Sequence, residues 1–275
     1  MPERMKIMFA AVVPAQNENI RVKQVIQNLL KLPLDLIIPV INGCRDDTLK
    51  FCLSLTSPKI YTLYSAVSLG IDVPRAVGAN FAYTLGAHGI LFIDGDMNGD
   101  LTYPLNLLMR AVKSGTDCAL TNCYPYIYAR HPLTKKVLKY REILNRRIGL
   151  FHQLGLASPS HGPHAVSRKL LDKIPIESLA VPPVEMAYAK MAGLKIDVAA
   201  AISHHKLGSR DKSLIHTKMV AHTIIGDCLE ALAVLNGTTR HRREGGISYD
   251  GYNPCRRFDL LNDYLKYQRG IQVFY

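Results

Sequence analysis

Strand-length apolar runs alternate with helical patterns through the first part of the chain, and this alternation limits the folds open to it. The apolar runs cover residues 8–13, 34–41, 59–65 and 90–93. Between them, apolar and small residues recur at the spacing of an α-helix. Parallel strands require such helical crossovers, so the pattern predicts an α/β fold in which a mostly parallel sheet is flanked by helices.

Polar residues follow three of these four predicted strands, at the point where each strand ends. The polar clusters comprise residues 14–18, 42–46 and 94–96. The carboxyl ends of parallel strands meet at one edge of a sheet, where open α/β folds bind their ligands. We therefore expect the three clusters to form a common binding site.

The third cluster, Asp94-Gly95-Asp96, has the pattern of a metal site. Side chains at i and i+2 of an extended segment point in the same direction, and the glycine between them lets a ligand approach the backbone. Two carboxylates so placed suit Mg²⁺ or Mn²⁺, which take their remaining ligands from water and phosphate. A polar turn without a metal is the alternative interpretation of so short a motif.

A calcium loop is a second alternative for the same stretch. Asp94, Asp96, Asn98 and Gly99 match positions one, three, five and six of an EF-hand loop. The twelfth position, which must supply a bidentate glutamate, is Leu105. Because this ligand is lacking and a strand rather than a helix leads into the loop, the sequence favours the Mg²⁺ or Mn²⁺ site.

Composition bears on the compartment and on the class of partner. The longest apolar stretches fall far short of the roughly 20 residues that a membrane span requires, no signal peptide is evident, and the six cysteines form no Cys-x-x-Cys pair. These features predict a cytoplasmic protein with reduced thiols. The formal net charge of +12 implies anionic partners, either phosphate groups or an acidic membrane surface to which the protein attaches peripherally. Nucleic acid is less favoured, because no zinc-finger spacing or aromatic-glycine RNA-binding stretch occurs.

The basic residues are enriched in the second part of the chain. A predicted helix over residues 133–151 carries a row of them, which forms either an anion path or a solvated basic face. Its members are Lys135, Lys136, Lys139, Arg141, Arg146 and Arg147. We expect a nucleotide-binding half in residues 1–100, an acceptor half in residues 101–215 and a basic helical extension in residues 216–275.

The succession of motifs resembles that of the inverting family 2 glycosyltransferases, which have the GT-A fold. The resemblance covers about residues 7–215 and rests on motifs at residues 12–18, 42–48, 76–80, 92–96, 162–171, 184–186 and 193–214. The second half is most similar to members that act on phosphorylated acceptors, such as polyprenyl-phosphate sugar transferases and glucosyl-phosphoglycerate synthases. The resemblance implies a GT-A type, Rossmann-like sheet and transfer of a sugar from a UDP- or GDP-linked donor.

Roles of individual residues also follow from this resemblance. The residues that would border the nucleotide sugar are Pro14, Ala15, Asn17, Glu18, Asn42, Asp46, Asn80, Asp94, Gly95, Ser209 and Arg210. Asp96 would bind the metal directly, supported by Asp94, and either His204 or His205 would complete the metal shell. Glu185 falls where the family has its catalytic carboxylate and would take the proton of an acceptor hydroxyl. With an ionised phosphate as acceptor, Glu185 would orient the donor instead.

Two other functions use this kind of sheet and site. A sugar-phosphate nucleotidyltransferase would commonly have a glycine-rich loop with basic residues after the first strand, whereas this chain has Gln16-Asn17-Glu18 there. A non-catalytic nucleotide-sugar-binding protein would keep the site and lack turnover. The sequence leaves the sugar, the acceptor and homo-oligomer formation open.

Overall fold

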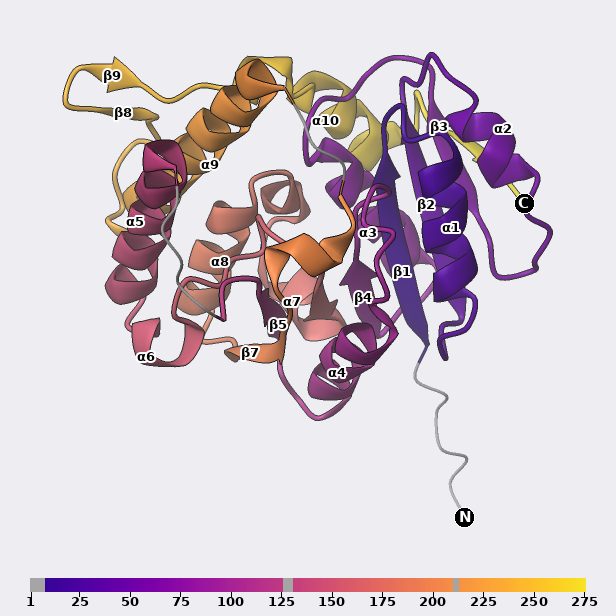
Figure 1. Ribbon diagram of the computed structural model, residues 1–275, viewed down its shortest axis with the longest axis horizontal. Coiled ribbons are helices and arrows are strands. Elements are labelled where there is room, and N and C mark those ends of the chain that lie inside the picture. The colour runs from indigo at the N-terminus through magenta and orange to yellow at the C-terminus, as the bar shows by residue number, and fades with distance from the viewer. Residues whose placement is uncertain (1–7, 126–130, 210–212) are drawn as a thin grey trace.

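The computed structural model describes residues 8–125, 131–209 and 213–275, and it begins with the predicted alternation of strands and helices (Figure 1). The elements of this first part are β1 (Phe9–Ala15), α1 (Ile20–Leu29), β2 (Leu36–Asn42), α2 (Thr48–Leu53), β3 (Thr62–Ser65), α3 (Val73–Thr84) and β4 (Gly89–Phe92). Each of the four strands overlaps the apolar run that predicted it. The spacing of apolar residues in the sequence therefore predicts where the strands of this half of the fold lie.

The middle of the chain has shorter and less regular elements. They are α4 (Thr102–Lys113), β5 (Cys118–Asn122), α5 (Pro132–Arg147), α6 (Phe151–Leu154), β6 (His164–Ser167), α7 (Arg168–Lys173), η1 (Ile176–Ala180), α8 (Pro182–Met191), β7 (Ile196–Ala201) and η2 (His204–Leu207). The predicted helix over residues 133–151 is wrong at its C-terminal end. Gly149 adopts a φ of 75°, a left-handed conformation that ends α5 before the separate turn α6 begins.

The last segment crosses back over the molecule. It contains α9 (Leu214–Leu235), β8 (Arg243–Glu244), β9 (Ile247–Ser248), η3 (Asn253–Cys255), α10 (Phe258–Tyr267) and β10 (Gln272–Phe274). α9 packs against α8 and α5, and α10 packs against α3. Figure 1 shows the yellow end of the chain returning to the edge of the indigo and purple N-terminal half, where β10 lies beside β3. The predicted helical extension therefore also supplies a strand of the main sheet.

The main sheet has eight strands in the order β10-β3-β2-β1-β4-β6-β5-β7. β1 pairs in parallel with β2 and β4, β2 pairs in parallel with β3, and β5 pairs in parallel with β7. β6 runs antiparallel between β4 and β5, and β10 runs antiparallel to β3. The predicted α/β fold with a mostly parallel sheet is confirmed. The antiparallel direction of β6 and the presence of β10 were not predicted.

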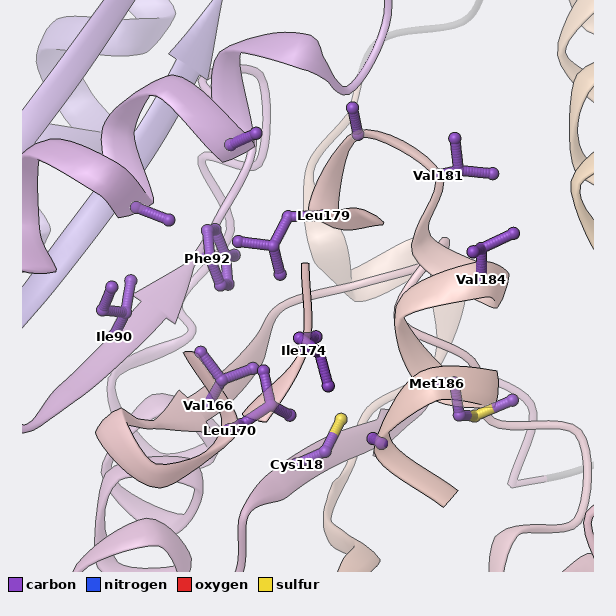
Figure 2. Close-up of a cluster of buried hydrophobic side chains, with 14 of the residues drawn as sticks. Ile90, Phe92, Cys118, Val166, Leu170, Ile174, Leu179, Val181, Val184 and Met186 are labelled. Carbon is purple, nitrogen blue, oxygen red and sulfur yellow. The ribbon is translucent and has the colours of Figure 1, made fainter. Parts of the chain in front are cut away.

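Helices cover both faces of this sheet. In β1, Ala10 and Val12 belong to the core beneath α3 and α8, whereas Phe9, Ala11 and Val13 belong to the core beneath α1 and α4. Burial of successive residues on both faces is typical of a central parallel strand. Figure 2 shows the first of these cores where β4, β5 and β6 approach α8. Its labelled side chains are Ile90, Phe92, Cys118, Val166, Leu170, Ile174, Leu179, Val181, Val184 and Met186.

The helix α9 spans 22 residues and lies within the fold. It buries two carboxylates, Asp227 and Glu230, which a lipid-facing helix would carry only at high cost. Across the described ranges, no helix is both long and apolar enough to cross a bilayer.

Candidate functional site

A cleft of about 560 Å³ opens at the carboxyl ends of β1, β2 and β4. The three polar clusters that follow these strands come together there, because parallel strands end at one edge of the sheet. The predicted site residues that line the cleft are Pro14, Ala15, Glu18, Asn42, Asp94, Gly95, Asp96, His204 and Ser209. The opposite wall comes from α9 and the turn η3.

The first wall is built by the turns after β1 and β2. Glu18 is 8% exposed, and its backbone N–H donates to Thr48 Oγ1 at 2.9 Å. Asn42 uses its side-chain amide within the fold: Oδ1 accepts from the Leu69 N–H at 2.6 Å, and Nδ2 donates to the Gly70 carbonyl at 3.1 Å. Asn42 therefore shapes the loop after β3, whereas Glu18 brings a carboxylate to this wall.

Asp94 and Asp96 have different partners. Arg75, in the first turn of α3, donates from Nη2 to Asp94 Oδ1 at 2.8 Å and from Nη1 to the Pro159 carbonyl at 3.1 Å. Burial by itself lowers the pKa of Arg75, but the neighbouring carboxylates, Asp94 first, outweigh it and raise that pKa. Asp96 accepts a hydrogen bond from Ser209 Oγ at 3.4 Å. Asp94 is therefore balanced by a cation of the fold, and its orientation is fixed by that cation.

The donor set fits a divalent cation that takes most of its ligands from a substrate. Asp96 and His204 line the same cleft, whereas His205 is not among the lining residues and has its ring centroid 5.8 Å from that of His204. Within the described ranges, no group of three or more Asp, Glu, His or Cys side chains is arranged to hold a metal ion. A closed zinc site needs such a group, but Mg²⁺ and Mn²⁺ complete their shells with water and phosphate oxygens.

His161 is a cleft residue that the sequence analysis did not single out. Its Nε2 lies 3.1 Å from His204 Nδ1, and its ring stacks on Tyr124 with 5.2 Å between centroids. A histidine that ligates a metal through one nitrogen is commonly oriented by a hydrogen bond at the other. His161 is placed to orient His204 in this way. A single histidine in a predicted loop carries no sequence signal that separates this position from a surface position.

Two predicted nucleotide-binding residues, Asn17 and Asp46, lie outside the cleft lining and stabilise its turns. Asn17 has a φ of 56° and accepts a hydrogen bond at Oδ1 from the Arg45 backbone N–H at 2.8 Å. Asp46 accepts from the Thr48 backbone N–H at 3.0 Å and from the Thr48 hydroxyl at 2.5 Å, at the start of α2. Both side chains fix the loops that carry the first wall.

Asn80 also lies outside the lining. Its side chain, on α3, hydrogen-bonds to the buried Tyr264 of α10, so it ties the last segment of the chain to the N-terminal half. Arg210, predicted for the loop over the diphosphate, falls outside the described residues. Its neighbour Ser209 is described and reaches Asp96.

Glu185 lies beneath the cleft and is not part of its lining. It occupies the first turn of α8 and is 1% exposed; burial raises its pKa to about 8, against an opposing effect of Arg75. Its Oε2 lies 4.0 Å from Nε2 of His164, whose own pKa is lowered by burial. Both groups are neutral near pH 7, so their contact is not an ion pair. The raised pKa suits a general base, but the burial does not bring the carboxyl into the cleft.

The second wall of the cleft belongs to the last segment of the chain. Its lining residues are His216, Val220, Thr223, Ile224, Asp227, Tyr252 and Cys255. His216 Nδ1 lies 2.9 Å from the Tyr252 hydroxyl, and Thr223 Oγ1 accepts from the Tyr252 N–H at 2.7 Å. No local motif in the sequence marks this wall, because its residues meet only through the packing of α9.

Buried ion pairs join the two walls, and we name Asp72, Asp227, Glu230, Arg242 and Arg256 the arginine clasp. Arg256 donates to Asp72 Oδ2 at 2.9 Å and to the two Asp227 oxygens at 2.7 and 2.8 Å. Arg242 donates to Asp227 and to Glu230, each at 2.7 Å. Burial opposes ionisation of Asp227, but the two arginines outweigh it and lower its pKa. Since Asp72 precedes α3 and Asp227 lies on α9, the clasp fixes the spacing of the walls.

No protein-family profile matches the chain, and no curated protein matches it. Solved structures do match. Glucosyl-3-phosphoglycerate synthase from Mycobacterium tuberculosis, in complex with Mn²⁺, UDP and phosphoglyceric acid, is 19% identical over 85% of this chain and 80% of that chain, with a TM-score of 0.59. The synthase with Mn²⁺, UDP-glucose and glycerol 3-phosphate is 19% identical over 85% and 82%, with a TM-score of 0.57. This likeness establishes the fold: the chain has the GT-A fold of these synthases.

Proposed function

We propose that the chain transfers a sugar from a nucleoside diphosphate sugar to a phosphorylated acceptor with the help of a divalent cation. The observation that carries the proposal is the meeting of Asp94, Asp96 and His204 at the strand ends of one cleft. The fold supports it, because the similar synthases are found with UDP-glucose, Mn²⁺ and phosphoglyceric acid. We also propose that the transfer inverts the configuration of the sugar carbon, as in the family 2 glycosyltransferases.

The donor nucleotide is assigned to the first wall. Pro14, Ala15 and Glu18 would border it, and Asp94 would face the ribose in the orientation that Arg75 imposes. A side chain at Gly95 would be crowded, because a Cβ at this position would lie 3.0 Å from the Pro14 carbonyl oxygen and 3.0 Å from the Ala15 Cβ. The glycine lets the ends of β1 and β4 approach each other beneath the donor.

Asp96 and His204 would hold Mg²⁺ or Mn²⁺. When bound, the ion neutralises the negative charge that grows on the departing diphosphate. His161 would keep the His204 ring in place through their 3.1 Å contact. Ser209 and Arg210 would belong to the loop over the diphosphate, and Ser209 already reaches Asp96.

Glu185 is proposed as the base for an acceptor hydroxyl. A pKa of about 8 leaves the carboxyl protonated at pH 7 unless a ligand changes its surroundings. Glu185 has Arg75 and His164 as neighbours. Arg75 also contacts Asp94, which lines the cleft, so it links Glu185 to the proposed donor site. For an acceptor phosphate that is already ionised, Glu185 would instead hold Arg75 and so orient the donor.

A stepwise binding and transfer assay tests the proposal. We expect UDP and UDP-linked sugars to raise the melting temperature in the presence of Mn²⁺, because a ligand of the native state stabilises it. Radiolabelled sugar should then move to 3-phosphoglycerate or glycerol 3-phosphate and not to glycerol. Tight donor binding without transfer to any acceptor would favour the non-catalytic binding protein.

The source of the acceptor phosphate is tested in the same assay. Activity on soluble phosphorylated acceptors that weakens with salt would support a phosphate in the cleft, since such attraction is screened over a Debye length of about 8 Å at physiological ionic strength. Flotation with anionic but not neutral liposomes would favour a lipid-linked acceptor. Salt-insensitive transfer to a neutral acceptor would contradict the phosphorylated class.

A further inference from the structure

The described part of the chain buries four arginines, and one of them lacks the partner that the others have. Arg75, Arg242 and Arg256 donate to carboxylates at 2.8, 2.7 and 2.7 Å. Arg141 of α5 is 1% exposed and forms no ion pair with any described Asp or Glu. Its Nε has no hydrogen-bond partner among the described residues.

A buried guanidinium without a counter-charge is costly. The energy of removing an ion from water is recovered only when a carboxylate, a dense set of hydrogen bonds or a ligand compensates it. Among the described residues, Arg141 has one hydrogen-bond partner, which is neutral: its Nη2 donates to Ser160 Oγ at 3.1 Å. The guanidinium lies 5.9 Å from the centre of the Tyr124 ring. A buried charge that lacks a partner in this way indicates that an anion binds to it during function.

Ser160 connects Arg141 to the cleft. Ser160 lines the cleft together with its neighbours His161 and Gly162. Its Oγ accepts from Arg141 and lies 2.9 Å from Ser158 Oγ. When Ser158 donates in that pair, Ser160 Oγ accepts twice, and its own O–H is left to donate to a cleft ligand with the arginine charge directly behind it.

The loop that carries Ser160 is held from two sides. Asn145, one turn after Arg141 on the same face of α5, donates from Nδ2 to the carbonyls of Gly155 and Ala157 at 2.8 and 3.0 Å. Arg75 donates to the Pro159 carbonyl at 3.1 Å from the other side. A donor fixed before the ligand arrives loses little freedom on binding, which is the property of a preorganised anion site.

We infer that Ser160, backed by the charge of Arg141, is an anion subsite for the phosphate or carboxylate group of the acceptor. The inference rests on the proposed function and assigns a place to the acceptor. Among the described residues that line the cleft there is no lysine, and the one arginine is Arg75. Arg75 is already paired with Asp94. Arg141 supplies the positive charge that an anionic acceptor needs and that the lining itself does not provide.

The test measures anion binding with the donor site already filled. Protein saturated with UDP and Mg²⁺ is titrated with inorganic phosphate in one arm and with acetate in the other, and the dissociation constants are obtained from the rise in melting temperature. The variants are Arg141→Met and Ser160→Ala. Arg147→Met is the matched control, because Arg147 is an exposed arginine of the same helix that donates to Asn236.

Arg141→Met is expected to weaken phosphate binding by about tenfold or more, and Ser160→Ala by about threefold to tenfold, the usual range for losing a charge-assisted or neutral hydrogen bond. Arg147→Met should leave phosphate binding unchanged. Without phosphate, Arg141→Met should melt no lower than the wild type, because methionine fills a similar volume and the uncompensated charge is gone. A merely structural arginine would lower the melting temperature and leave phosphate affinity unchanged.

The remaining outcomes also decide the question. A stronger response to acetate than to phosphate assigns the subsite to a carboxylate, and the reverse assigns it to a phosphate. Equal anion affinity in the wild type and in both variants overturns the inference while UDP binding stands. A wild type that does not bind UDP overturns the proposed function itself. Should Arg141→Met fail to fold, Ser160→Ala decides: lost affinity supports the subsite and retained affinity removes it.

Discussion

The N-terminal half and the last segment of the chain build opposite walls of one cleft by different means. In the N-terminal half, the cleft residues follow the ends of β1, β2 and β4, so the backbone hydrogen bonds of the sheet position them. In the last segment, the cleft residues stand on α9 and η3, and the arginine clasp holds them by side-chain ion pairs. We therefore expect the loss of a side chain to lower the stability of the fold little at the first wall and strongly at the second.

The largest expected effect is a loss of ligand binding at the first wall without a loss of stability. Asp96→Ala should abolish Mn²⁺-dependent binding of UDP, because it removes the carboxylate assigned to the metal. The melting temperature without ligand should stay near that of the wild type, since the residue lies at a strand end that the sheet already holds. Calorimetry with UDP and Mn²⁺ measures the first quantity. Unchanged UDP affinity in a folded variant would remove Asp96 from the metal site.

The next effect concerns Glu185, which lies beneath both walls. If it takes the acceptor proton, Glu185→Gln should lower kcat by about two to four orders of magnitude while the donor dissociation constant stays near normal. Steady-state kinetics and UDP calorimetry on the same preparation separate the two quantities. A parallel loss of donor binding would assign Glu185 to holding Arg75 and the donor.

The arginine clasp gives a comparable effect on stability instead of activity. Arg242→Ala should lower the free energy of unfolding by at most about 3–5 kcal/mol, because it leaves the buried Asp227 with Arg256 alone and the buried Glu230 with Arg240 alone. Arg257→Ala is the control: the Arg257 side chain is partly exposed and pairs with the exposed Asp259, so its loss should not change stability measurably. Urea denaturation compares the two. Equal effects would mean that the second wall does not depend on the clasp.

A pH dependence of the stability also originates at Glu185. The usual pKa of 4.5 applies in the unfolded chain, and burial raises the folded value to about 8. As pH rises between these values, the unfolded state releases a proton that the folded state keeps, so this group's contribution to stability falls by up to about 1.4 kcal/mol per pH unit. Below the lower value the contribution is complete.

Denaturation of the wild type and Glu185→Gln at pH 5 and pH 8 measures this contribution. The wild type should lose stability relative to the variant as pH rises, because glutamine has no proton to release. Parallel stability curves for the two proteins would contradict the raised pKa.

Sequence periodicity predicts the parts of the molecule that depend on local structure. An apolar run of strand length precedes Asp94 and Asp96 and predicts their position at a strand end. Adjacent residues differ in placement only through the turn η2, so the sequence does not separate His204 from His205. Asn80, predicted to border the nucleotide sugar, contacts Tyr264, a partner distant in sequence.

Pairings that depend on tertiary packing had no sequence signal. Arg141 was one member of a basic row on α5, and nothing local distinguishes it from Arg147, although one is buried and the other is exposed. Arg256 and Asp227 lie on separate elements of the last segment, and their pairing with Asp72 depends on how that segment crosses the sheet. The strand β10 is three residues long and gave no apolar run to predict it.

The arginine clasp sets an order of events during synthesis on the ribosome. The strands β1 to β4 leave the exit tunnel before the segment from α9 to β10, and their pairing involves neighbours in the chain, so this part of the sheet can form early. Asp72 has Arg75 beside it from the start but gains its second cation only when Arg256 is translated, and burial without Arg256 would raise its pKa further. A nascent chain therefore presents the strand ends to solvent until the segment from α9 to β10 has been translated.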